Sequence, residues 1–272
     1  MKINKTGIGL TFSMLLMSTV LAAADFDKGL QAYQSGDYET ALAEFEPLAI
    51  EGNPAAQYYA ANLYFEGAGT STNITRAIEL YTMASSQDVA DAQYALGYIY
   101  LNGASGVDVD QEEALKWFRM SAERGLIEGQ YNLAKMYLSG IGGPVDYESA
   151  LFWYHQAAEK GLLGAQNNLG LMYKEGLGVT ADNETAIEWY LKAARQGDGF
   201  AQNNIGVIYA NQSYKKFSYL KAYMWFSISE NSSKSGLKNK ENIALRLSKK
   251  QVAEAQRMKV SCLTSNFYNC FW

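Results

Sequence analysis

The sequence repeats itself about every 36 residues, and this period restricts the fold more than any other feature. Its first marker is an alanine, spaced by 36, 37, 36, 36 and 36 residues, at Ala41, Ala77, Ala114, Ala150, Ala186 and Ala222. An aromatic residue follows each alanine by four positions. Its second marker is a glutamine sixteen residues after an alanine, at Gln57, Gln93, Gln130, Gln166 and Gln202. Such a chain is predicted to be a linear stack of similar units.

Each unit reads as two helices, because apolar residues recur in it at helical spacing. The helix that starts near the glutamine is predicted to stop at a glycine: Gly67, Gly103, Gly140 or Gly176. The second helix is preceded by a residue suited to an N-cap: Asn73, Asp110, Asp146 or Asp182. It is predicted to end at a glycine in most units, and at Ser85-Ser86 in the second. These features predict an all-α solenoid of stacked antiparallel helix hairpins.

The segment before the repeats has the features of a secretory signal peptide. Lys2 and Lys5 precede an apolar run that ends in Ala22-Ala23-Ala24. A basic start, a short apolar stretch and small residues at a cleavage point are typical of such a peptide. We therefore expect residues 1–24 to be removed after Ala24, which leaves a periplasmic or secreted protein with no stable membrane insertion. The run is shorter than the roughly 20 residues that a retained membrane anchor needs.

Residues 165–197, AQNNLGLMYKEGLGVTADNETAIEWYLKAARQG, closely resemble the Sel-one-like repeat, a relative of the tetratricopeptide repeat. The resemblance covers most of 54–230, as five repeats, and implies a right-handed solenoid. Residues 25–53 look like a shorter tetratricopeptide hairpin that caps the N-terminus. Residues 231–272 resemble the closing helices of such arrays, followed by a cysteine-containing tail. The stretch 211–216 replaces the usual glycine-rich loop, so an irregular connection is expected there.

The composition excludes several kinds of chemistry. One His and two Cys cannot supply a four-ligand zinc site, and they leave little room for a histidine base. The formal charge of −5, or −7 once Lys2 and Lys5 are removed, lacks the basic footprint of a nucleic-acid binder. The single histidine, His155, lies in a variable column and is predicted to face solvent. No metal, cofactor or catalytic residue is predicted.

Several repeated features have a structural and a functional interpretation. The column Trp117, Trp153, Trp189 and Trp225 could form a ligand cage, but its period favours the core. The glycine-rich loops resemble phosphate cradles only weakly, because they follow helices and no Lys-Ser/Thr follows them. They are more simply explained as hairpin turns. A small residue four positions after each glutamine (Ala61, Gly97, Ala134, Gly170 or Gly206) would let a neighbouring helix approach closely.

Cys262 and Cys270 are the only thiols, and both follow the last predicted helix. In an oxidising compartment two cysteines at this separation are expected to pair within the chain. Two free thiols, or a bond to another chain, are the alternatives.

An enzyme is the alternative to a binding protein, because a cysteine-rich branch of the family is associated with β-lactam binding and hydrolysis. Three S-x-x-K matches occur, at Ser213/Lys216, Ser218/Lys221 and Ser235/Lys238. No S-D-N motif accompanies them, and the only K-T-G lies in the signal peptide. The cysteine pairs of that branch are also missing from the repeats. We therefore expect no enzyme activity.

The predicted function is that of a non-catalytic scaffold of the bacterial cell envelope, which binds a protein or peptide on its concave face. In helical-hairpin solenoids the first helix of each hairpin lines that face. Its columns that are not needed for the core are rich in Tyr and Asn, which suit contact with a peptide. The candidate residues are Tyr58, Tyr59, Asn62, Tyr94, Tyr98, Tyr131, Asn132, Lys135, Asn167, Asn168, Asn203 and Asn204. The asparagines at 132, 168 and 204 have an alternative role in bonds within the array.

Overall fold

The computed structural model describes residues 24–268 and Cys270, and over this part of the chain it is all-helical. The predicted signal peptide, 1–24, lies outside the described residues except for Ala24. The helices are α1 (Phe26–Ser35), α2 (Tyr38–Ile50), α3 (Pro54–Glu66), α4 (Ile74–Ser85), α5 (Ala90–Asn102), α6 (Gln111–Glu123), α7 (Ile127–Ser139), α8 (Tyr147–Glu159), α9 (Leu163–Glu175), α10 (Asn183–Arg195), α11 (Gly199–Ala210), α12 (Tyr219–Ser229), α13 (Lys234–Ala244) and α14 (Lys249–Thr264).

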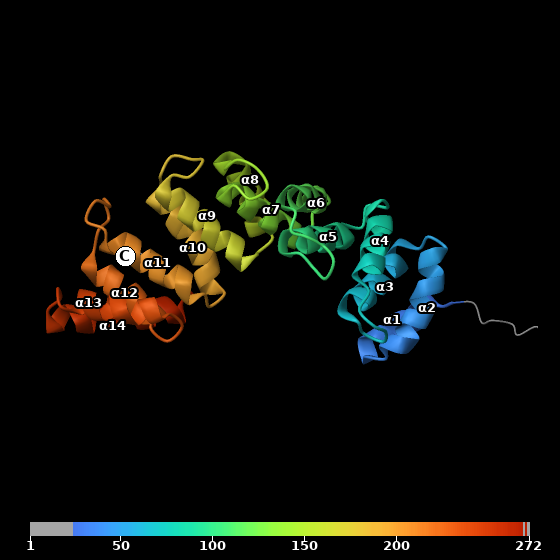
Figure 1. Cartoon of the computed structure of the whole chain (residues 1–272). Helices are drawn as coiled ribbons and strands as arrows, with labels where there is room; N and C mark the ends of the chain where they lie inside the picture. Colours follow the sequence, from blue (N-terminus) through green and yellow to red (C-terminus); the bar gives the residue numbers. More distant parts are fainter. Residues whose placement is uncertain (1–23, 269, 271–272) are drawn as a thin grey trace, which may run out of the picture.

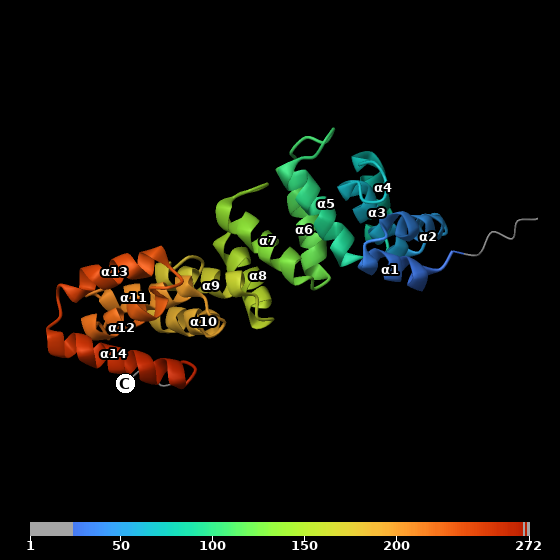
Figure 2. The same cartoon turned by 90° about the horizontal axis from the view of Figure 1, so that it is seen from below.

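The helices stack in chain order to form an arch. Each helix packs mainly on the helices that precede and follow it in sequence, as expected for a solenoid. Helix α1 lies at one end of the arch and α14 at the other, and both views show the same progression (Figures 1 and 2). The predicted solenoid of stacked helix pairs is confirmed.

The predicted helix caps are present. The side chains of Asn73, Asp110 and Asp146 each accept the backbone N–H three residues ahead, at 3.0 Å, and Asp182 accepts that of Glu184 at 2.9 Å. These bonds satisfy N–H groups that have no partner inside the helix.

The end of α4 differs from the sequence-based expectation. Ser85 and Ser86 do end the helix, but Asp88 takes the left-handed conformation, with φ of 64°. Glycines have this conformation in the other units, for example Gly125 with φ of 89°. The turn thus needs a positive φ at this position, and Asp is one of the few other residues that tolerate it. The Asp88 carboxylate also forms an ion pair with Arg124.

The connection between α11 and α12 is irregular, as predicted. Its backbone is held by short turns, with Tyr214 N–H donating to Asn211 and Phe217 N–H donating to Tyr214. Tyr214 is buried in the middle of this connection. The loop therefore contributes an aromatic side chain to the core near the C-terminal end, which a glycine-rich loop would not.

The core consists of the periodic columns. The aromatic residue four positions after each marker alanine is fully or almost fully buried, at Phe45, Tyr81, Phe118, Tyr154, Tyr190 and Phe226. The small column allows these rings to approach the neighbouring helix. A Cβ added to Gly170 would lie 2.6 Å from the Tyr190 ring, and one added to Gly97 would lie 2.9 Å from the Phe118 ring. Close approach is therefore the reason for the small residues.

The burial of the tryptophan side chains in this column differs along the chain. Trp117 and Trp153 are half-buried against it, Trp189 is 6% exposed, and Trp225 is completely buried. The column is thus part of the packing, and its burial increases toward the C-terminus.

Candidate functional site

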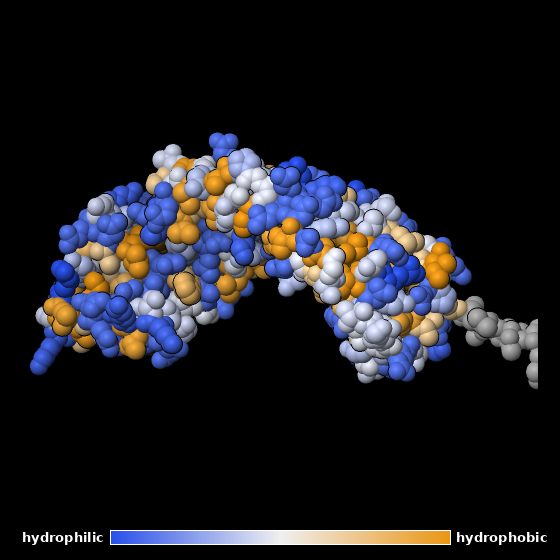
Figure 3. Space-filling view, in the orientation of Figure 1, coloured by the Kyte–Doolittle hydropathy of each residue, from blue (hydrophilic) through white to orange (hydrophobic). Residues whose placement is uncertain are grey.

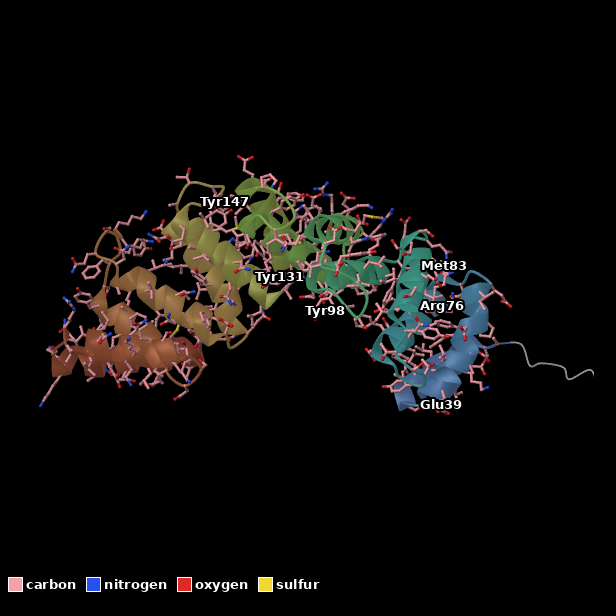
Figure 4. The ribbon with its side chains drawn as sticks, viewed as in Figure 1. Glu39, Arg76, Met83, Tyr98, Tyr131 and Tyr147 are labelled. Carbon is pink, nitrogen blue, oxygen red and sulfur yellow. A yellow bond between two sulfur atoms is a disulfide. The ribbon has the colours of Figure 1, made fainter. Side chains whose placement is uncertain are left out.

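The arch has an open hollow on its inner side (Figure 3). Tyr98 of α5 and Tyr131 of α7 lie along the inner edge of the arch, whereas Tyr147, at the start of α8, lies on its outer edge (Figure 4). The first helices of successive repeats thus contribute side chains to the hollow. This is the surface on which the sequence placed the candidate binding residues.

A pocket of about 280 Å³ opens between α3 and α5, over α4. It is walled mainly by aromatic and aliphatic groups and carries two carboxylates. Its lining residues are Tyr58, Phe65, Glu66, Tyr81, Asp91, Tyr94, Ala95, Tyr98 and Ile99. We call it the tyrosine pocket.

The repeat itself builds the tyrosine pocket. Tyr58 and Tyr94 occupy the same column of consecutive repeats, one position after the glutamine, so stacking brings them to the two sides of one opening. Tyr98 follows Tyr94 by four residues and therefore lies on the same face of α5. Tyr81 reaches the pocket from α4, and its hydroxyl donates to Asn62 Oδ1 at 2.5 Å. The ring is thereby fixed in the floor of the pocket.

The two carboxylates of the pocket come from helix ends. Glu66 is the last residue of α3, and Asp91 lies in the first turn of α5. Neither has a hydrogen-bond or ion-pair partner among the described residues. Burial raises the pKa of Tyr58, and the nearby charges of Asp91 and Glu66 raise it as well. The pocket is thus an apolar opening in a negative field, and Tyr58 stays neutral at physiological pH.

Burial also raises the pKa of Tyr94, and here the additional negative charge comes from Glu128. Glu128 lies in the same column as Asp91, one repeat further along. The negative field therefore extends from the tyrosine pocket toward α7.

The other candidate residues lie outside this pocket, and those of α9 and α11 lie further along the array. Tyr59 packs into the core of the N-terminal hairpin, with its ring 5.2 Å from that of Phe45. Tyr131 packs on Tyr154 at 5.7 Å, and Asn132 donates to the carbonyl of Glu128 on its own helix. Lys135 is exposed. Asn62, Asn167, Asn168 and Asn204 are half-buried.

Asn203 is not available to a partner. It is 7% exposed, and its Oδ1 accepts a hydrogen bond of 2.9 Å from Asn239 of α13. Asn239 lies 36 residues further on, so α13 continues the stack and covers the column at this point. The prediction of a binding role for Asn203 therefore needs correction, because the closing helix occupies its surface.

Sequence reasoning found the three inner tyrosines of the pocket but missed Phe65, Glu66, Tyr81 and Asp91. Tyr81 belongs to the column of aromatic residues that follow the marker alanines, so nothing in the repeat pattern distinguishes it as a pocket residue. The columns of Glu66 and Asp91 are acidic in only two repeats each, with Glu175 and Glu128 as the second members, so no fully repeated pattern predicts these carboxylates. The signal that could have identified them is their position at helix ends next to the tyrosine columns.

The glutamine column also has a role that the sequence did not indicate. Each glutamine is buried and donates its side-chain N–H to the backbone carbonyl eight residues earlier, at the end of the preceding helix. These bonds are 3.1–3.4 Å long and hold consecutive repeats together. In two joints a second glutamine, Gln87 or Gln196, donates to the first. The column is therefore structural.

The residues considered for catalysis have other contacts. Ser218 caps α12 by accepting the N–H of Lys221, whereas Lys216 pairs with Glu184 at 2.8 Å. His155 is half-buried rather than solvent-facing as predicted, because its ring packs edge-on against Trp189 at 5.2 Å. No group of three or more metal-ligating residues lies together in 24–268 or at Cys270.

Cys262 and Cys270 form a disulfide, as predicted for an intramolecular pair. The prediction that both follow the last helix is wrong for Cys262, which lies in the last turn of α14 because this helix continues to Thr264. It closes a loop that holds Phe267 in the core, where its ring stacks on Trp225 at 5.7 Å. None of the helices in the described part of the chain is both long and apolar enough to cross a membrane.

Comparison with known proteins agrees with this architecture. The Sel1 repeat profile matches residues 54–89, 90–126, 127–162, 164–198 and 199–230. A Sel1 repeat protein from Oxalobacter formigenes has a similar structure, with 32% identity over 77% of this chain and 86% of the other, at a TM-score of 0.71. No curated protein gives a significant sequence match.

A second similar structure is a protective antigen present in uropathogenic Escherichia coli strains, which displays an SLR fold. It is 29% identical over 89% of this chain, at a TM-score of 0.70, and this chain spans 53% of its length. Five matched repeats over more than half of the sequence, in an all-helical stack, lead to one assignment: the chain belongs to the Sel1 repeat family.

Proposed function

We propose that this protein is a non-catalytic scaffold of the bacterial cell envelope, and that it binds a protein or peptide partner on the inner surface of its arch. The observation that carries the proposal is the tyrosine pocket. Four tyrosines and two unpaired carboxylates line this opening, and one of the tyrosines, Tyr98, lies on the inner edge of the arch (Figure 4). Tyrosine gives a large contact area with little loss of side-chain freedom, so such an opening suits recognition of another chain.

The envelope location is supported by two features. The N-terminal sequence has the pattern of a signal peptide, and the Cys262–Cys270 disulfide is typical of proteins in oxidising compartments. The similar antigen from uropathogenic Escherichia coli is compatible with such a place in the cell. We expect osmotic shock to release a form that begins at Asp25, as measured by intact mass. A protein that keeps Met1 and stays with the cytoplasmic fraction would contradict the location.

Photo-crosslinking in the cells that produce the protein tests the binding surface. A photoreactive phenylalanine analogue at position 98 replaces a residue that is 51% exposed on the inner edge. The matched control carries the analogue at position 147, which is 40% exposed on the outer edge. We expect a discrete crosslinked product from position 98 and none from position 147. Products from position 147 alone would contradict the proposal.

The non-catalytic part of the proposal has its own test. Acylation by a fluorescent penicillin would require a reactive serine, and Ser218 is the candidate nearest to a half-buried lysine, Lys221. Burial lowers the pKa of Lys221. We expect no covalent label on the intact protein. A label that disappears in Ser218→Ala would show a reactive serine and would contradict the non-catalytic assignment.

A further inference from the structure

We propose that the tyrosine pocket receives the side chain of an arginine presented by a peptide segment of the partner. This inference rests on the proposed function, since it specifies the chemistry of the partner at the same inner surface. It is carried by three properties of the pocket: its aromatic walls, its unpaired carboxylates and its size.

The walls present tyrosine rings to whatever enters. Tyr58 comes from one side and Tyr94 and Tyr98 from the other, with Tyr81 in the floor. Tyr58 and Tyr81 lie 6.1 Å apart with their planes tilted by 50°, so their faces are not stacked on each other. Tyr98 is half exposed and has no aromatic partner among the described residues. A planar guanidinium can stack on such rings and bind them by cation–π attraction.

The charges of the pocket lack a counter-ion. Glu66 and Asp91 are unpaired within the described residues, and none of the nine residues that line the pocket is basic. The pocket beside α10 gives a contrast, because its Glu184 carboxylate is already paired with Lys215 at 3.2 Å and Lys216 at 2.8 Å. The inner pocket therefore complements a cation from outside the chain. The neighbouring Glu128, which acts on Tyr94, adds to the attraction.

The size and chemistry of the pocket favour a single side chain, and arginine over lysine. At about 280 Å³ the pocket is at the small end of ligand sites, which suits one long side chain better than a larger ligand. A guanidinium offers five donors in a plane, so it can bind a carboxylate with two bonds while it stacks on a ring. It is also less strongly hydrated than an ammonium group. Both properties match a pocket in which rings and carboxylates lie together.

The test uses four capped amino acids as probes: the Nα-acetyl methylamides of arginine, citrulline, lysine and leucine. Citrulline has nearly the shape of arginine without the charge. Binding to the full mature chain is followed by NMR of tyrosines labelled with ¹³C in the ring. We expect saturable binding of the arginine probe, at least about threefold tighter than that of citrulline and of lysine, with leucine weakest. Equal or tighter binding of citrulline, lysine or leucine, or no saturable arginine binding, would overturn the proposal.

Matched variants locate the binding. Glu66→Gln and Tyr98→Ala change exposed residues of the pocket, so the fold should persist. Each should weaken the binding of the arginine probe by about threefold or more. Higher salt should reduce the effect of Glu66→Gln on this binding. The controls Glu112→Gln and Tyr147→Ala alter exposed residues of the same types elsewhere and should leave binding unchanged. Equal losses in controls and pocket variants would also overturn the proposal.

The outcome is separable from that of the proposed function. If the arginine preference is absent but position 98 still crosslinks to a partner, the arginine assignment fails and the inner binding surface stands. If crosslinks arise only from position 147, the proposed function fails whatever the probes show.

Discussion

The second and third helical hairpins place one column of residues in different surroundings from the sixth hairpin. In α3 and α5 the column holds Tyr58 and Tyr94, which line an open pocket. In α11 it holds Asn203, which is covered by Asn239 of the next helix. The difference arises because α13 and α14 close the array at the C-terminal end. In a solenoid whose units contact only their neighbours, one end can be rigidly closed while another region remains available to a ligand.

The tryptophan column shows the same contrast in the core. Trp117 and Trp153 are half-buried, whereas Trp225 is completely buried beneath the closing helices and the disulfide loop. The large buried core at the C-terminal end extends from α10 to Cys270. We therefore expect the C-terminal end to be the more stable region and the tyrosine pocket to lie in the less stable one.

The largest expected effect comes from Trp225→Ala. Loss of a completely buried indole that stacks on Phe267 should lower the free energy of unfolding by about 3–5 kcal/mol. Trp117→Ala should cost clearly less, because part of that ring already contacts water. Urea denaturation of both variants measures the difference. Equal losses would contradict the difference in burial between the two regions.

Reduction of the Cys262–Cys270 bond should have the next largest effect. The chain-entropy model assigns roughly 2.5 kcal/mol to a loop of this length. Because the units contact only their neighbours, faster hydrogen exchange should be confined to the closing region α12–α14, and α3–α5 should be unchanged. The Cys262→Ala/Cys270→Ala protein is the control for side effects of the reductant. Faster exchange in the tyrosine pocket would show that the two ends are coupled.

Gly206→Ala and Gly97→Ala test how well the packing in the C-terminal and N-terminal regions accommodates an added methyl group. The added methyl group would lie 2.6 Å from the Phe226 ring in the first case and 2.9 Å from the Phe118 ring in the second. Overpacking of this kind costs about 1–3 kcal/mol. We expect the larger loss for Gly206→Ala, since the closing helices hold Phe226 in place. Thermal unfolding of the two variants measures which one loses more stability. A larger loss for Gly97→Ala would indicate a more rigid N-terminal region.

The smallest expected effects, of opposite sign, come from removing single hydroxyl groups. Tyr81→Phe loses the bond to Asn62 and should destabilise by about 1 kcal/mol. Tyr154→Phe should be neutral or slightly stabilising, because the buried hydroxyl has no hydrogen-bond partner within the described residues. Chemical denaturation distinguishes them, and a destabilised Tyr154→Phe would show that the hydroxyl has a partner such as water.

Buried tyrosines, among them Tyr64, Tyr81 and Tyr154, also determine how the stability of the protein responds to alkaline pH. Burial, reinforced by Glu46, raises the pKa of Tyr64 to about 12, and burial raises those of Tyr81 and Tyr154 as well. A raised pKa means that ionisation favours the unfolded state, so the stability from these groups is fully present below pH 10. It should fall as the pH rises above about 10 toward the folded-state values. A stability that stays constant from pH 9 to 12 would contradict this.

Much of the fold could be predicted from the sequence because the same pattern of residues recurs in each repeat. The marker alanines, the cap residues Asn73 to Asp182 and the small column all predicted features that the structure shows. The Cys262–Cys270 pair was also predictable, because few other arrangements were open to the only two thiols. A helix that is hard to identify in one repeat can be identified from the same columns in the other repeats. The type and order of the helices could therefore be predicted from the sequence.

The tertiary structure decided what each repeated position faces. Tyr58 and Asn203 occupy one column, yet one lines a pocket and the other is covered by α13, because burial depends on the neighbouring unit. The presence of both Glu66 and Asp91 in the lining of this pocket likewise depends on how α3 and α5 stack. The sequence by itself determined the helices, their caps and the core columns, which are local and repeated. Only the packing of the units decided where the array stays open, since that is set by contacts between residues far apart in the chain.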